Sequence, residues 1–148
     1  MAKKAKQLKY KLLSIKTEQF TTIENIYKEE ETTEINTIIS FKSSSDHRII
    51  NSISKFSLLQ KESVFLILEV SCSFGIKDES WMLIWNKSTD TTTLPRNFAI
   101  LLAGLNIDTS RGILSSRTEQ SPYKEVLIPI LDISHYIISD VVITSIEG

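Results

Sequence analysis

Alternation of apolar and polar residues predicts β-strands in the first half of the chain. The strongest signal lies at residues 64–76, where one side of the segment is apolar at every second position. Residues 34–43 alternate as cleanly, while residues 8–20 and 47–60 alternate with a break in phase that predicts a bulge in each. Because the four segments follow one another through short polar connections, we expect mostly antiparallel neighbours.

The period changes after residue 76. Trp81, Ile84 and Trp85 share one helical face in a short helix that Asp78 is placed to cap. A longer helix follows from residue 94, with Thr93 as its expected cap and Pro95 in its first turn. Its expected buried face has the i, i+3, i+4, i+7 spacing of an amphipathic helix and comprises Phe98, Leu101, Leu102, Leu105, Thr109 and Ile113.

Glycine and proline divide the rest of that region. Gly104 lies in the middle of the long helix, where it costs about 1 kcal/mol against alanine and suggests close packing. We expect a kink at residues 110–112, then a loop, and an extended stretch at residues 126–132 that returns to the sheet. For residues 133–148 we favour a helix, although residues 141–143 also fit a strand.

Composition limits the class of protein. The 148 residues are 41% hydrophobic and 24% charged, with a formal net charge of -1, which is typical of one globular domain spanning residues 1–148. This near-neutral charge favours neither nucleic acid nor an anionic membrane. No apolar run approaches the roughly 20 residues that a membrane span requires. Residues 1–7 are basic, lack the features of a signal peptide and are expected to be disordered.

The residues that usually carry chemistry do not cluster. The four glycines are too widely spaced for a phosphate-binding loop, and neither His47 nor His135 has a second metal ligand at helical or hairpin spacing. The single cysteine, Cys72, excludes an internal disulfide and makes the cytoplasm the default compartment. It lies on an apolar strand face, where a thiol is a small hydrophobe. We therefore predict no enzyme activity, no metal and no cofactor.

Candidate functional residues are instead those of binding surfaces. Phe65 and Ile67 form a second apolar face at one end of the last strand, and we expect this face to line a binding site. Trp81 and Trp85 are either core anchors or a binding platform beside it. An acidic run after the first strand is either a solvated loop or a docking patch for a basic partner, and it contains Glu29, Glu30, Glu31 and Glu34. Arg111 precedes Gly112 and either pairs with an acidic neighbour or contacts an anion or a partner.

The order of these features resembles that of SecB and SecB-like export chaperones. The resemblance covers residues 8–136 and is carried by FLILEVSCSFGI, LPRNFAILLAGLNIDTSRGIL and VLIPILD. It implies an α+β fold in which a four-stranded antiparallel sheet is packed by a long helix and a shorter C-terminal helix. Two such protomers pair in this family, and the dimers pair again into a homotetramer.

The resemblance also implies a function. SecB-like proteins are chaperones that bind unfolded polypeptides or preproteins in apolar grooves without ATP, and some deliver them to the translocase motor SecA for protein export. Phe65, Ile67, Trp81 and Trp85 are then the expected groove-lining residues, and Glu29–Glu34 is the expected docking surface. The alternative is a dedicated single-partner chaperone or interaction protein, such as the SecB-like proteins associated with toxin–antitoxin systems.

Overall fold

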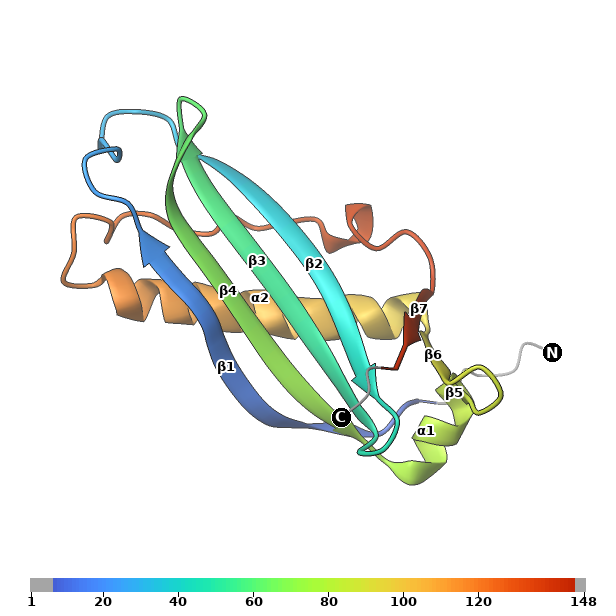
Figure 1. The fold of residues 1–148 in the computed structure, drawn as a ribbon. Coiled ribbons are helices and arrows are strands. Elements are labelled where there is room, and N and C mark those ends of the chain that lie inside the picture. Colours follow the sequence, from blue (N-terminus) through green and yellow to red (C-terminus); the bar gives the residue numbers. More distant parts are fainter. Residues whose placement is uncertain (1–6, 146–148) are drawn as a thin grey trace.

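The computed structural model describes residues 7–145, which are organised around one large antiparallel sheet (Figure 1). Its strands lie in the order β1-β4-β3-β2 and comprise β1 (Tyr10–Thr22), β2 (Glu34–Ser44), β3 (Ile49–Gln60) and β4 (Ser63–Ile76). The four predicted strands are thus confirmed. Although β1 and β2 are consecutive in the chain, they lie at opposite edges of the sheet, because β1 pairs with β4.

Two helices and a smaller sheet complete the fold. Helix α1 (Asp78–Ile84) follows β4, and helix α2 (Arg96–Thr118) packs across one face of the large sheet against β3 and β4. The second sheet has the order β5-β6-β7 and consists of β5 (Trp85–Asn86), β6 (Thr91–Leu94) and β7 (Val141–Thr144). The α+β class, the four-stranded sheet and the long helix are as predicted.

After α2 the chain runs back in an irregular conformation along the length of that helix (Figure 1). We call residues 123–132 the strap. The strap leads into a short 3₁₀ helix, η1 (Ile133–His135), and then into β7. The expected return of residues 126–132 to the sheet is wrong, since the strap pairs with no strand.

The expected C-terminal helix is also wrong. Apart from η1, residues 133–145 contain only the strand β7, in which Val141–Thr144 pair antiparallel with β6. Pairing with a partner some 50 residues earlier decides the conformation of a β-branched run that fits both states locally. Residues 1–6 and 146–148 lie outside the described residues, and so does most of the segment for which we expect disorder.

Side chains of β3 and β4 alternate between the covered face and the open face of the sheet. The covered face of β4 is buried along the strand, as its sequence predicts, and comprises Leu66, Leu68, Val70, Cys72, Phe74 and Ile76. Between Leu58 and Leu59 the register of β3 against β4 shifts. This irregularity places Phe65 inside as well as Leu66. Strand β1 carries two such shifts, which confirms the bulge that its phase break predicts.

The face that α2 buries is rotated from the predicted one. Leu101 and Leu105 are exposed, at 44% and 39%. The buried face carries small and polar side chains among its apolar ones, and it comprises Phe98, Ala99, Leu102, Ala103, Asn106, Ile107, Ser110, Leu114 and Thr118. Small residues allow the helix to approach the sheet closely, and Ser52 and Ser54 on β3 are fully buried below it.

Asn106 connects α2 to two strands of the sheet. Its side-chain Nδ2 donates to the carbonyl of Ser52 on β3 at 2.7 Å and to the carbonyl of Val70 on β4 at 2.9 Å. The hydroxyl of Ser110 donates to the Asn106 Oδ1 at 3.0 Å, so the buried amide is satisfied at both ends. A buried polar group with its hydrogen bonds complete fixes the position of a helix more narrowly than apolar packing does.

The first turn of α2 is capped by a residue that is distant in the sequence. Thr93 is not the cap, because it belongs to β6, and the helix begins at Arg96. The Asp140 carboxylate accepts a hydrogen bond from the backbone N–H of Arg96 at 2.8 Å. An acidic group at a helix N-terminus satisfies a free donor and is favoured by the helix dipole. This contact joins the segment after the strap to the start of α2.

The expected kink of α2 at Ser110–Gly112 is absent, since the helix runs from Arg96 to Thr118 without interruption. The expected close packing at Gly104 is also absent, because a Cβ there would meet only the Ile133 side chain at 3.5 Å, an ordinary contact. A Cβ on Gly112 would meet nothing within 4 Å. Both glycines therefore weaken the helix without a packing reason.

Replacing Asn106 by alanine should lower the free energy of unfolding by about 2 to 3 kcal/mol, because it removes a buried amide and its hydrogen bonds. Chemical denaturation monitored by tryptophan fluorescence measures this change. Asn97→Ala makes the same substitution at an exposed position of α2 and should leave stability within about 0.5 kcal/mol. Equal effects of the two substitutions would contradict the role of Asn106.

Replacing Gly112 by alanine should raise the free energy of unfolding by about 0.5 to 1 kcal/mol. Alanine favours the helical conformation more than glycine does, and its Cβ would meet nothing within 4 Å. Thermal unfolding should shift upward by a few degrees, about 2 to 4 °C per kcal/mol for a chain of this size. A lower melting temperature would show that the position needs glycine for a contact outside the protomer.

Candidate functional site

A groove of about 410 Å³ opens at the end of the sheet where β2 begins and β3 ends. One wall is the β1–β2 loop, residues 23–33, and the other is the strap. Residues from both walls and from the sheet line the groove, namely Tyr27, Glu29, Glu31, Thr33, Ile35, Leu58, Glu125, Val126, Leu127 and Pro129.

The floor of the groove is apolar and lies on the covered face of the sheet. Ile35 of β2 and Leu58 of β3 are directly opposite each other in the strand register, and Leu58 is only 1% exposed. On the strap, Val126 is buried and Leu127 is 70% exposed. A concave site with an apolar floor and a partly open wall is suited to bind apolar side chains.

Three aromatic rings join the two walls below the groove. The Phe65 ring lies 5.0 Å from the Tyr27 ring of the loop and 5.9 Å from the Tyr123 ring of the strap. The two tyrosine rings are 5.4 Å apart. These centroid distances are those of favourable aromatic pairs, so the cluster packs the loop against the strap.

The rim of the groove is acidic. Glu29 and Glu125 are exposed, and neither takes part in an ion pair among the described residues. Burial raises the pKa of the Tyr27 hydroxyl above its usual value, and the negative charges of Glu29 and Glu125 raise it further. Glu31 is paired instead, at 3.1 Å from Lys61 Nζ and 4.0 Å from Lys28 Nζ. The unpaired negative charge thus comes from Glu29 and Glu125.

The side chain of Gln60 fixes the β1–β2 loop. Gln60 ends β3, is 2% exposed and accepts a hydrogen bond from the backbone N–H of Lys28 at 2.8 Å. Its Nε2 donates to the carbonyls of Lys28 at 2.9 Å and Glu31 at 3.2 Å, and to the Thr33 hydroxyl at 3.1 Å. One amide therefore holds the loop against the end of β3 at three points, Lys28, Glu31 and Thr33.

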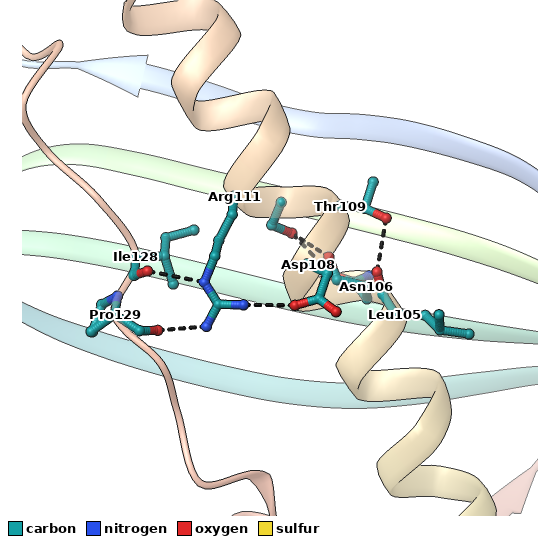
Figure 2. A network of polar contacts seen from close by, with 8 residues as sticks. Leu105, Asn106, Asp108, Thr109, Arg111, Ile128 and Pro129 are labelled. Carbon is teal, nitrogen blue, oxygen red and sulfur yellow. Dashed lines mark hydrogen bonds and ion pairs between the residues drawn. The ribbon is translucent and has the colours of Figure 1, made fainter.

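The side chain of Arg111 fixes the strap in a similar way (Figure 2). Its Nε donates to the carbonyl of Ile128 at 3.0 Å, and its Nη2 donates to the carbonyl of Pro129 at 2.6 Å. The Asp108 carboxylate, 2.7 Å from Nη1, orients the guanidinium from within α2. The predicted pairing of Arg111 with an acidic neighbour is confirmed, and its two contacts with the strap are additional.

The four residues expected to line a binding site do not form one surface. Phe65 is fully buried in the aromatic cluster, so its expected place on the open face of β4 is wrong, because the irregular register turns it inward. Ile67 is half-buried on the open face, opposite Thr21 and Ser57. Phe65 and Ile67 thus lie on opposite faces of the sheet.

The two tryptophans belong to another part of the fold. Trp81 is 2% exposed within the core, and its ring lies 6.5 Å from that of Trp85. Trp85 starts β5, is half-buried and donates its indole N–H to the Asp90 carboxylate at 2.8 Å. Neither lines the groove. Their placement matches the core-anchor alternative.

The acidic run is divided by the structure. Glu29 and Glu31 line the groove, while Glu30 and Glu34 are exposed and do not line it. Sequence reasoning missed Leu127 and Glu125 as groove residues. Leu127 had a usable signal, since it is an apolar residue in a proline-containing segment without strand alternation. Glu125 had none, because no local pattern brings it to Glu29.

A second apolar surface lies over β1. Helix α2 covers β3 and β4 but leaves part of β1 open, so Leu12 and Ile15 are 50% and 48% exposed. Leu101 and Leu105 add exposed apolar area from α2. A shallow hollow of about 600 Å³ at the start of α2 includes Leu101 in its lining. We call these four leucine and isoleucine side chains the β1–α2 surface.

Within residues 7–145, no three or more histidine, cysteine or acidic side chains are grouped so that they could hold a metal ion. None of the helices in that part of the chain is long and apolar enough to cross a membrane. Burial raises the pKa of the Cys72 thiol, which is 1% exposed.

Comparison with known proteins gives a match at the level of structure. No family model matches the sequence, and no curated protein matches it. Among solved structures, the SecB-like chaperone Rv1957 of Mycobacterium tuberculosis, in complex with a ChAD peptide from the Rv1956 HigA1 antitoxin, is similar with a TM-score of 0.55. The match has 9% sequence identity and covers 82% of this chain and 90% of the other. The chain therefore has a SecB-like fold, in divergent form.

Proposed function

We propose that this protein is an ATP-independent chaperone that holds an extended segment of another polypeptide in the groove. The observation that carries the proposal is the apolar floor of Ile35 and Leu58 between two walls that are already in place. An unfolded segment exposes apolar side chains, and burying them in a preformed groove is favourable without an external energy source.

The edge of β2 supports the same proposal. Among the described residues, β2 pairs only with β3 within the large sheet, so backbone donors and acceptors on its outer edge are available to a further strand. Thr33 and Ile35, at the start of that edge, also line the groove. An extended segment that adds to an open sheet edge gains backbone hydrogen bonds that do not depend on its sequence, while alternate side chains enter a neighbouring pocket. This combination suits a protein that binds non-native chains.

A dedicated chaperone for one partner is the second candidate function. It is favoured by the similar fold of Rv1957, a SecB-like chaperone solved with an antitoxin peptide, and by the acidic rim, which restricts the choice of ligand. A stoichiometric complex with one partner, combined with no affinity for generic unfolded chains, distinguishes this candidate from a general chaperone.

Two further properties are part of the proposal. We propose that the protein forms a homo-oligomer through the β1–α2 surface, because its four apolar side chains are otherwise exposed to water. Glu30 and Glu34 remain exposed outside the groove and are available to dock a second partner such as SecA. Light scattering coupled to size exclusion gives the oligomeric state directly.

Replacing Leu127 by serine should weaken the binding of an unfolded polypeptide about 10-fold, because it removes one exposed apolar side chain from the groove wall. Fluorescence anisotropy of a labelled unstructured peptide measures the affinity, and light scattering of a client diluted from denaturant measures protection from aggregation. Leu83→Ser is the matched control, because Leu83 is 54% exposed on α1 and lines neither the groove nor the β2 edge.

In that experiment the control should retain the affinity and the protection of the unchanged protein. If Leu127→Ser and Leu83→Ser behave alike, the groove is not the binding site. If the unchanged protein binds no unfolded chain at all and protects no client, the chaperone function itself is wrong.

The acidic rim should favour peptides with a basic residue beside an apolar one. Changing Glu29 and Glu125 together to glutamine should reduce the affinity for a lysine-containing peptide several-fold at low salt, and should remove most of its salt dependence. The same peptide with glutamine in place of lysine should bind both proteins equally. Asp46→Asn, at the exposed turn between β2 and β3, removes a negative charge elsewhere and should change nothing.

A further inference from the structure

Both walls of the groove are irregular segments, and among the described residues they make few backbone hydrogen bonds to the sheet or to α2. Such segments are ordinarily the least stable parts of a fold, because few backbone hydrogen bonds hold them. Here one buried or half-buried polar side chain of a regular element makes several hydrogen bonds to each wall. Gln60 at the end of β3 bonds Lys28, Glu31 and Thr33 of the loop, and Arg111 of α2 bonds residues 128 and 129.

The functional group of each side chain matches the backbone groups that it contacts. The Gln60 amide accepts from one N–H of the loop through its oxygen, and its two donor hydrogens serve two carbonyls and a hydroxyl, so one N–H is shared between two acceptors. The Arg111 guanidinium is planar and presents its donors in a fixed fork, which matches two consecutive strap carbonyls. Lysine, with one charged nitrogen, does not reproduce that fork.

Neither side chain is part of the groove surface. The residues that line the groove include Glu31, Thr33 and Pro129, which receive the hydrogen bonds, but not Gln60 or Arg111 themselves. Both therefore act on a bound polypeptide only through the walls.

We propose that Gln60 and Arg111 are positioning residues that hold the two walls in their binding geometry before a polypeptide arrives. The proposal rests on the function proposed above. The hydrogen bonds of Gln60 to the β1–β2 loop and of Arg111 to the strap keep the groove open. The groove is thus a preformed site whose walls do not need to order around each client.

Preformation has a kinetic consequence that separates a positioning residue from a contact residue. When a wall is loosened, only the fraction of molecules with an ordered wall can bind, and the apparent affinity falls by that fraction. The contacts of the bound state are unchanged, so the association rate falls while the dissociation rate stays the same. Removing a contact, as in Leu127→Ser, acts mainly on the dissociation rate instead.

The experiment uses Arg111→Lys, which keeps the positive charge beside Asp108 but loses the fork to the strap. Stopped-flow binding of a labelled unstructured peptide should show an association rate about 5- to 10-fold lower, with a dissociation rate within about 2-fold of the original. Hydrogen exchange should become faster across residues 123–130 in the free protein. Gln60→Met should act in the same way on the other wall, with faster exchange at residues 28–33.

The matched control is Arg117→Lys, the same substitution six residues further along α2. The Arg117 guanidinium lies over the Phe20 ring at 5.5 Å and makes no hydrogen bond to the strap among the described residues. This control should leave both rates and the exchange of the strap unchanged. If Gln60→Met fails to fold, the Arg111→Lys and Arg117→Lys pair still decides the question.

The outcomes distinguish the two proposals. An unchanged association rate and unchanged strap exchange in Arg111→Lys would overturn the positioning role and leave the chaperone function intact. A faster dissociation with an unchanged association rate would make Arg111 a contact residue and also overturn the inference. If the unchanged protein binds no peptide, the proposed function fails, and strap exchange alone then tests whether Arg111 orders the wall.

Discussion

The side chain of Asn106 is the contact on which the rest of the architecture depends. A helix lying on a sheet through apolar packing alone has several rotations of similar energy, whereas two hydrogen bonds from one buried amide to neighbouring strands select a single rotation. That rotation exposes Leu101 and Leu105, which creates the β1–α2 surface, and it places Arg111 on the flank of α2 beside the strap. The position of the strap, which forms one wall of the groove, therefore depends on the two hydrogen bonds that Asn106 makes in the core.

The functional part of the protein is assembled from segments that are distant in sequence. The β1–β2 loop and the strap are separated by some 90 residues, yet the Phe65, Tyr27 and Tyr123 rings pack them together. Phe65 belongs to β4 of the sheet, and Tyr27 also lines the groove, so the cluster connects the sheet to the groove. The strands and α2 thus fix the positions of the groove walls, while the walls themselves are irregular segments. Many binding proteins share this arrangement.

Sequence patterns predicted the four strands of the large sheet, α1 and α2, because each of these elements depends on local periodicity. They failed where a distant partner decides the outcome. Apolar periodicity favoured Leu105 over Asn106 for the buried face. It takes no account of the hydrogen bonds that Asn106 makes with carbonyls of the folded sheet. The β-branched run in β7 gave no local preference until β6 was available to pair with it. Phe65 was placed on the wrong face because a register irregularity inverts the alternation at that point. Half of the groove, the strap with Glu125 and Leu127, carried no signal that links it to the loop.

The two edges of the large sheet differ in regularity. β1 has two register shifts along its length, whereas β2 pairs with β3 in unbroken register over its 11 residues. A regular open edge is a template on which strands from other molecules can accumulate without limit. Of the two outer strands, β2 therefore offers a further strand the more regular template, because the register shifts of β1 interrupt its edge. Addition of a strand to the folded sheet is thus favoured at one edge over the other, so the irregularity of β1 limits the directions in which a strand can extend the sheet.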